Sequence, residues 1–189
     1  MSTPLENPDK FDLKGHTVLI IEDEPTNLAV MSDYLAGFDL EVLTARNGKS
    51  GLDKAWYAQP DLILLDVMMP GIDGFETCRQ LKQNEASREI PVIFMTALVR
   101  EEDKVKGFEV GGVDYVTKPI QPAEVLARVT THLRIRDLTR TLQKQNKEME
   151  ELAYQLYEQN DRLRKLSQEV EKKNARLEKM AAALRALKE

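Results

Sequence analysis

The sequence predicts an α/β fold, a five-stranded parallel, doubly wound sheet, followed by a long α-helical coiled coil. Short apolar runs alternate with helix-length amphipathic stretches up to about residue 120, and a heptad pattern occupies the rest of the 189 residues. All nine glycines and all eight prolines lie at or before Pro122, so no helix breaker follows that position. The balance of charge changes from acidic to basic near residue 131. These observations divide the chain into two modules.

The expected strands are the apolar runs of the first module, and four of them are apolar throughout rather than alternating. Parallel strands that are covered on both faces have this pattern. The five runs are Thr17–Ile21, Leu40–Thr44, Asp61–Leu65, Pro91–Met95 and Val113–Val116.

The expected helices lie between these runs and carry apolar residues at helical spacing. They are Pro25–Ala36, Gly48–Ala58, Gly74–Gln83 and Glu101–Val110, followed by one from about Ala123. Pro25 suits a first helical turn, whereas Gly37 and Gly111 suit positions just past helix ends.

Composition excludes several classes of protein. The single cysteine, Cys78, excludes a disulfide framework and a cysteine-based metal site, and it suits a reducing cytosol. The two histidines, His16 and His132, are too far apart in sequence to suggest a histidine-rich metal site. The longest apolar stretches, such as Val18–Ile21, are too short to span a bilayer. Residues 1–14 lack the apolar region of a signal peptide and are expected to be flexible, so we expect a soluble, cytoplasmic protein.

Polar side chains end or follow the expected strands at the edge where such sheets bind ligands. Glu22 and Asp23 follow the first strand, Asp66 the third, Thr96 the fourth and Lys118 the fifth. Carboxylates that meet there repel, by roughly 4 kcal/mol for two unit charges 4 Å apart at an effective dielectric of 20, unless a cation lies among them. Oxygen ligands without histidine or cysteine favour Mg²⁺.

The combination of Mg²⁺ with an ammonium group points to a phosphoryl group, whose oxygens both can neutralise. No glycine-rich loop follows the first strand, which disfavours nucleotide binding. A carboxylate that accepts the phosphoryl group is therefore the favoured interpretation.

Residues 15–132 resemble the receiver domain of two-component response regulators. The resemblance rests on motifs that occur in the same order: Glu22-Asp23, the run from Asp66 to Gly74, Thr96-Ala97, Tyr115 and Lys118-Pro119. It implies the flavodoxin-like receiver fold and a sensor histidine kinase or phosphotransfer protein as the partner.

The resemblance also implies roles for the acidic residues. Asp66 would accept the phosphoryl group from a phosphohistidine or a small acyl phosphate. Mg²⁺ would be ligated directly by Asp23, Asp66 and the backbone carbonyl of Met68, and by Glu22 through water.

Thr96 and Lys118 would complete the catalytic set by binding phosphoryl oxygens. Thr96 and Tyr115 would form the switch, with Tyr115 turning inward when Thr96 moves. The bond before Pro119 would be cis, which only an X-Pro peptide adopts at low cost.

Two further positions flank the phosphoacceptor in this family, two residues after Asp66 and two after Thr96. They are Met68 and Leu98, both apolar, so neither side chain can orient an attacking water by hydrogen bonding. We therefore expect a slowly hydrolysing phosphoaspartate.

The second module, residues 133–189, is expected to be a coiled-coil helix continuous with the last helix of the first. From Leu138 to Leu187 a 4–3 spacing runs unbroken, and His132, Leu133 and Ile135 precede it at helical spacing. Every a position is apolar, while three d positions are polar. The a positions are Leu142, Met149, Leu156, Leu163, Val170, Leu177 and Leu184, and the polar d positions are Gln145, Gln159 and Lys173. The strict period of seven predicts a left-handed supercoil and a homodimer through residues 138–187, with the polar layers fixing a parallel register.

Three function classes remain open. The favoured one is a response regulator, a phosphorylation switch rather than an enzyme, which transmits its state through a dimeric stalk. A Mg²⁺-dependent phosphohydrolase is disfavoured because Met68 stands where a second acid is needed. A coiled-coil scaffold or adaptor with a receiver that is not phosphorylated is the third class, and the truncated regulatory part of a larger protein with a catalytic output domain is a further alternative. Acidic residues interrupt the basic ones between 134 and 151, so nucleic-acid binding is not expected, and neither is membrane binding.

Overall fold

The computed structural model describes residues 11–97 and 101–186. Most of the expected flexible segment 1–14, and the flanking position Leu98, lie outside the described residues. The chain divides into two units, one that ends at Leu138 and one that begins at Thr139. Each unit is described by itself below.

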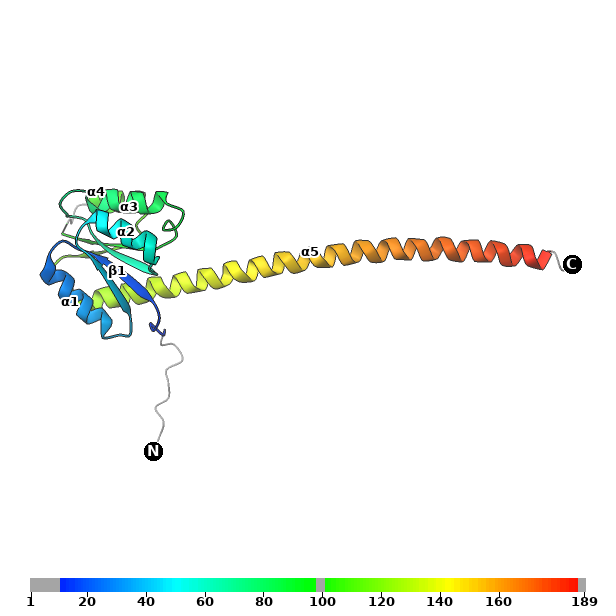
Figure 1. Cartoon of the computed structure of the whole chain (residues 1–189), viewed down its shortest axis with the longest axis horizontal. Helices are drawn as coiled ribbons and strands as arrows, with labels where there is room; N and C mark the ends of the chain where they lie inside the picture. Colours follow the sequence, from blue (N-terminus) through cyan, green and yellow to red (C-terminus); the bar gives the residue numbers. More distant parts are fainter. Residues whose placement is uncertain (1–10, 98–100, 187–189) are drawn as a thin grey trace, which may run out of the picture. The chain divides into compact units, whose positions relative to one another are not determined.

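The first unit contains a single sheet of five parallel strands, as the sequence predicts (Figure 1). The strand order is β2-β1-β3-β4-β5, which is doubly wound around β1 and β3. The strands are β1 (Thr17–Ile21), β2 (Glu41–Ala45), β3 (Leu62–Asp66), β4 (Val92–Thr96) and β5 (Asp114–Thr117).

Four strands begin and end one residue later than the apolar runs indicate. The difference arises because backbone pairing continues past the apolar side chains: Asp66 pairs with Met95, and Thr96 pairs with Thr117. Leu40, by contrast, is buried but precedes the first pair of β1 and β2. Asp66 and Thr96 consequently belong to strands, whose backbones hold them more rigidly than loops would.

Over residues 11–97 and 101–186, five helices accompany the sheet: α1 (Pro25–Ala36), α2 (Gly48–Ala58), α3 (Gly74–Gln83), α4 (Glu101–Glu109) and α5 (Pro122–Ala186). The first three have the predicted bounds. Side chains satisfy the free amides at two of their first turns: Asn47 Oδ1 accepts the Ser50 amide at 2.9 Å, and Asp73 Oδ1 accepts the Glu76 amide at 2.7 Å. These caps start α2 and α3 where the apolar periodicity begins.

The sheet is covered on both faces. The helices α2, α3 and α4 lie on one face, and α1 and the first part of α5 on the other (Figure 1). Successive residues of each central strand enter opposite cores, so Leu19 and Ile21 pack against α2 and α3, while Val18 and Ile20 pack against α1 and α5. This explains why the central strands are apolar at every position.

The second unit is the continuation of α5 from Thr139. Its apolar a positions from Leu142 to Leu177 are exposed in the single chain, from 52% at Leu156 to 67% at Met149. The structure therefore confirms a long C-terminal helix, and the pairing of two such helices stays a prediction. Within the described ranges, no helix combines the length and the apolar character that a membrane span requires.

Candidate functional site

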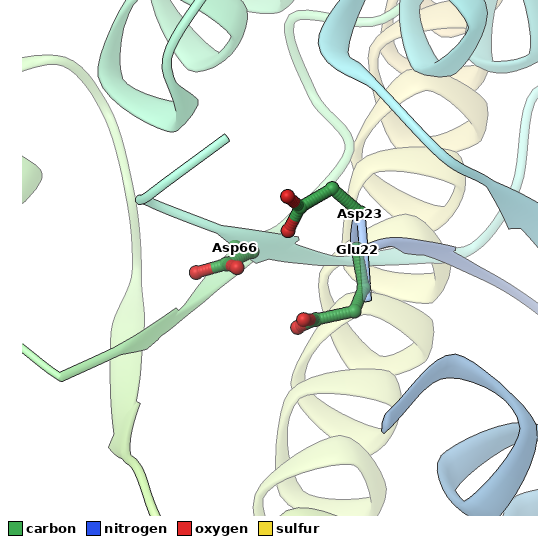
Figure 2. A group of neighbouring side chains, drawn as sticks. All are labelled: Glu22, Asp23 and Asp66. Carbon is green, nitrogen blue, oxygen red and sulfur yellow. The ribbon is translucent and has the colours of Figure 1, made fainter. Parts of the chain in front are cut away.

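Three carboxylates converge where two central strands end. Glu22 and Asp23 follow β1, and Asp66 is the last residue of the adjacent strand β3. Their ligand oxygens all lie within 4.8 Å of one another, and Figure 2 shows the side chains approaching from the two strand ends. Glu22 and Asp66 are each only 1% exposed. Burying two carboxylates this close together requires a compensating positive charge.

Lys118 supplies one such charge from the residue after β5. Its Nζ donates to Asp66 Oδ2 at 2.7 Å and to Glu22 Oε1 at 3.1 Å. Burial alone would lower the pKa of this lysine, but the hydrogen bonds and charges of Asp66 and Glu22 outweigh burial and raise it. The ammonium therefore stays protonated. The peptide bond from Lys118 to Pro119 is cis, as predicted.

The donor set also fits a divalent cation. Glu22 Oε2 is buried and accepts no hydrogen bond from the described residues, although it lies 3.0 Å from Lys118 Nζ. Three carboxylates face one ammonium, which leaves excess negative charge, and all the donors are hard oxygens. Mg²⁺ prefers such ligands and keeps several of its waters, for which the half-buried Asp23 leaves access.

The loop after β3 holds Asp66 closely. The Met68 amide donates to Asp66 Oδ1 at 3.1 Å, and the Gly74 amide donates to the Val67 carbonyl at 3.0 Å. A Cβ on Gly74 would lie 2.3 Å from the Asp66 carbonyl oxygen, so only glycine permits this approach. The Met68 side chain is 62% exposed, beside a carboxylate that is almost fully buried.

A small pocket, of about 20 Å³, lies between α4 and β5 and is lined by both predicted switch residues. Thr96 is buried at the end of β4, one rung beyond the Asp66–Met95 pair. Tyr115 is half-buried, with its ring centroid 6.3 Å from that of Phe108 and 4.4 Å from Lys104 Nζ. The ammonium over the ring is a cation–π contact. Tyr115 is thus placed by two side chains of α4.

The comparisons with known proteins bear on this arrangement of carboxylates, lysine, threonine and tyrosine. Residues 18–130 match the family model of the response regulator receiver domain, which is more than half of the chain. The chain belongs to this family. Phosphorylation on aspartate and Mg²⁺ binding at the acidic cluster are typical of receiver domains.

Relatives of this receiver domain carry different functions. A probable cyclic di-GMP phosphodiesterase of Vibrio cholerae is 41% identical over 139 residues, which cover 74% of this chain and 31% of that protein. The DNA-binding dual master transcriptional regulator RpaA of Synechocystis is 43% identical over 64% of this chain and 50% of its own length. The solved BeF₃-activated receiver domain of Klebsiella pneumoniae RstA is 32% identical, with a TM-score of 0.58 over 63% of this chain and 99% of its own. The chain spans about a third to a half of the length of these two curated relatives.

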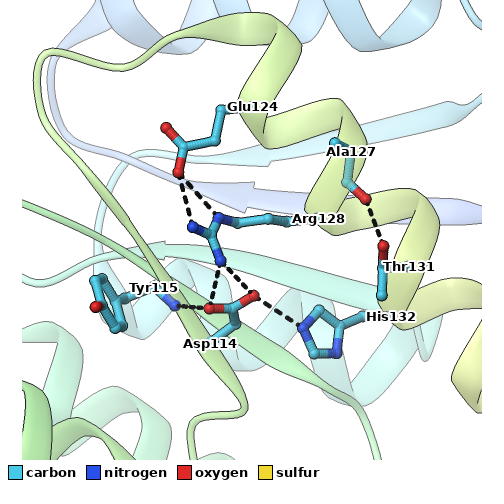
Figure 3. A network of polar contacts seen from close by, with 7 residues as sticks. All are labelled: Asp114, Tyr115, Glu124, Ala127, Arg128, Thr131 and His132. Carbon is cyan, nitrogen blue, oxygen red and sulfur yellow. Dashed lines mark hydrogen bonds and ion pairs between the residues drawn. The ribbon is translucent and has the colours of Figure 1, made fainter.

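A polar network joins β5 of the receiver domain to α5 (Figure 3). Arg128 Nη1 donates to both carboxylate oxygens of Asp114, at 2.8 and 2.9 Å, and Arg128 Nη2 donates to Glu124 Oε1 at 2.8 Å. His132 Nε2 lies 3.1 Å from Asp114 Oδ2, and the Tyr115 amide donates to Asp114 Oδ1 at 2.8 Å. Burial would raise the pKa of Asp114, but the hydrogen bonds from Arg128, Tyr115 and His132 lower it. Asp114, the first residue of β5, is therefore bonded to two turns of α5.

The predicted site residues from the acidic cluster and Lys118 come together, and the structure adds residues that the sequence did not indicate. Asn27 Nδ2 donates to Glu22 Oε1 at 3.2 Å from the first turn of α1. Lys104 of α4 contacts Tyr115, and Arg128 of α5 contacts Asp114. The only available signal for Asn27 was its place on the helix that follows Glu22 and Asp23. For Lys104 and Arg128 there was no signal, because charged residues on helices are usually solvent-facing.

Proposed function

We propose that this chain is a response regulator in which Asp66 accepts a phosphoryl group. The observation that carries the proposal is the convergence of Glu22, Asp23 and Asp66 within 4.8 Å, with Lys118 Nζ 2.7 Å from Asp66. An Asp66 carboxylate oxygen attacks phosphorus, the bond from phosphorus to the donor's imidazole nitrogen or acyl oxygen breaks, and the donor keeps the electron pair. Lys118 remains beside the new phosphoryl oxygens and neutralises part of their charge. The donor is a histidine kinase, a phosphotransfer protein or a small acyl phosphate.

Asp23, Asp66 and the Met68 carbonyl would hold Mg²⁺ directly, and Glu22 through water. When bound, the ion neutralises charge on the transferred phosphoryl group. Lys118 bridges the carboxylates of Glu22 and Asp66 by donating a hydrogen bond to each. Met68 fixes the Asp66 carboxylate through its amide, and its exposed apolar side chain has no group with which to orient an attacking water. A long-lived phosphoaspartate follows from this arrangement.

Thr96 and Tyr115 form the proposed switch. Both line the small pocket between α4 and β5, so a movement of Thr96 toward a phosphoryl oxygen changes the space next to Tyr115. The Tyr115 ring then exchanges its contacts with Lys104 and Phe108 for positions deeper in the pocket. This change reshapes the surface formed by α4 and β5.

The proposed output is a homodimer through residues 138–187. The a positions from Leu142 to Leu177, at 52–67% exposed, form an apolar seam along the second unit that a partner helix would remove from water. We further propose that the protein acts in the cytoplasm, as the reduced, buried Cys78 suits.

A second candidate function is that of the regulatory part of an enzyme, which the 41% identity to a probable cyclic di-GMP phosphodiesterase favours.

The direct test is the intact mass of the chain after incubation with acetyl phosphate and Mg²⁺. We expect one added phosphoryl group in the wild type, none in Asp66→Ala, and none when EDTA replaces Mg²⁺. Asp53→Asn, an exposed carboxylate on α2, is the matched control and should gain the group normally. If the wild type gains no mass and also shows no response to beryllium fluoride, the phosphorylation proposal fails and a scaffold with an inert receiver is favoured.

A further inference from the structure

The part of α5 in the receiver domain has two different faces. One is buried in the sheet's core and includes Val125, Val129 and Leu133, each 0% exposed. The other is open to solvent and includes Ile135, which is 51% exposed, and Leu138, which is 56% exposed. Large apolar side chains on an open helix face next to a coiled-coil sequence are candidates for a continuation of the same interface.

The open face has the same heptad phase as the seam of the second unit. Counted back by sevens along the sequence, the a position of Leu142 falls on Ile135 and the d position of Leu138 falls on Thr131. At about 100° per residue, the centre of these a and d positions lies roughly 150° around the helix from the buried face. Leu133, which the sequence alone placed at the start of the coil, instead packs in the receiver core. The a and d positions on this part of α5 therefore lie away from the receiver core.

Two contacts, which together we call the clamp, hold this part of α5 against the base of the sheet. Arg136 contacts Pro60 and Asp61, and His16 contacts Asp137. Arg136 Nη1 donates to the Pro60 carbonyl at 3.0 Å and also to the Asp61 carbonyl, and its side chain is 10% exposed. His16 Nε2 lies 3.1 Å from Asp137 Oδ2. Both contacts lie on flanks of the helix away from the a and d positions, so the clamp fixes the rotation of α5 with Ile135 outward.

The flanks of the seam favour a second copy of the same chain. In a parallel pair each e position lies beside a g position of the other helix, and like charges there would repel. All e positions from 139 to 181 are uncharged, so no e–g pair of like charge forms between two copies in register, and the like-charge pair that remains is Lys173 against its own copy at one d position. These e residues are Thr139, Asn146, Ala153, Asn160, Ser167, Asn174 and Ala181.

We propose that the surface through which two copies pair begins inside the receiver domain, at Thr131 and Ile135 on the outward face of α5, and that the clamp holds this face outward. The inference rests on the proposed homodimer through residues 138–187. It places the two receiver domains side by side along α5 and makes receiver residues part of the dimer contact.

The test is disulfide formation between copies that carry one new cysteine each, under mild oxidation. Ile135→Cys tests the proposed surface, Leu142→Cys reports the coil, and Arg134→Cys is the control, exposed and next to Ile135 but off the seam. Native Cys78 is buried, and burial raises the pKa of its thiol to about 11, so the wild-type chain serves as the blank. We expect Ile135→Cys to cross-link within about twofold of the Leu142→Cys rate and about tenfold faster than Arg134→Cys, because only seam positions bring their Cα atoms within disulfide distance.

The outcomes separate the two proposals. If Leu142→Cys cross-links but Ile135→Cys cross-links no faster than Arg134→Cys, the inference is overturned. The coil dimer is then left intact. No cross-linking of Leu142→Cys overturns the dimer itself and this inference with it.

The clamp is tested in the same chains by adding Arg136→Gln and Asp137→Asn. The freed helix rotates, so the ratio of Ile135→Cys to Arg134→Cys cross-linking should fall at least about threefold toward unity. Circular dichroism confirms that the variants remain folded. An unchanged ratio in a folded variant refutes the role of the clamp.

Discussion

Replacing Asp23 by asparagine is expected to stabilise the chain when no metal is present. The oxygens of Glu22, Asp23 and Asp66 lie within 4.8 Å of one another. At that separation two unit charges repel by about 3.5 kcal/mol at an effective dielectric of 20, and Asp23 has two such neighbours. Lys118, whose Nζ lies 2.7 Å from Asp66 and 3.0 Å from Glu22, offsets part of this repulsion, and water screens the half-buried Asp23. We therefore expect a net gain of about 1–2 kcal/mol in the free energy of unfolding.

The assay is urea unfolding followed by circular dichroism, with EDTA or with Mg²⁺. In EDTA, Asp23→Asn should unfold at higher urea than the wild type. Mg²⁺ at a hundred times its dissociation constant should stabilise the wild type by about 2.7 kcal/mol and the variant much less, because a ligand is lost. Asp53→Asn, an exposed carboxylate on α2, should alter neither result.

Two outcomes would count against this reasoning. A variant that is no more stable than the wild type in EDTA would mean that the three carboxylates do not repel in the folded chain, and the electrostatic reason for a cation would disappear. A variant that is stabilised in EDTA but still responds to Mg²⁺ as the wild type does would show that Asp23 is not a ligand.

Other predictions concern the phosphoryl lifetime, the loop after β3 and the network on β5. Met68→Asn should lose the phosphoryl group from Asp66 faster, because an amide can orient water; an equal or slower mass decay would contradict this. Gly74→Ala should lower stability by about 2–3 kcal/mol in urea unfolding, since its Cβ would lie 2.3 Å from a backbone oxygen, and wild-type stability would refute the close packing. Asp114→Asn should cost about 1–2 kcal/mol at neutral pH through its weakened bond to Arg128. The pKa of Asp114 lies below the ordinary value of 3.8, so the loss of stability caused by Asp114→Asn should be constant above pH 3.8 and shrink as the pH falls below it. A loss of stability that does not change with pH would show that the carboxylate charge is not responsible.

The strands and the acidic cluster could be predicted from the sequence because both follow from one-dimensional patterns. A buried parallel strand is apolar at every position, so the polar residues after it are conspicuous, and the parallel order brings them to one edge. Asp66 and Lys118 are 52 residues apart, yet both were expected at the same edge for this reason. The one-residue shifts of four strands arose because apolar character does not reveal where backbone pairing stops.

The contacts of α5 could not be predicted in this way. The helix carries apolar residues on two faces, Val129 and Leu133 on one and Ile135 and Leu138 on the other, and the pattern alone does not say which packs on the sheet. The rotation of the helix is decided by tertiary packing and by the contacts at its base. The bonds of Arg128 and His132 to Asp114 depend on the same rotation, so they too were hidden in the sequence.

One short element, β5, joins Lys118 of the proposed phosphorylation site to the part of α5 in the receiver domain. The strand β5 has four residues, with Lys118 directly after its last residue and Asp114 as its first. In the proposed mechanism Lys118 remains beside the new phosphoryl oxygens, and we infer that their arrival displaces the short strand to which Lys118 is joined. Asp114 is bonded to Arg128 and His132, so such a displacement pulls on α5, while the clamp at Arg136 holds the same helix one to two turns further on. A helix held at two points that are displaced relative to each other must tilt or rotate, and either movement would change how Ile135 meets a second copy in the proposed dimer.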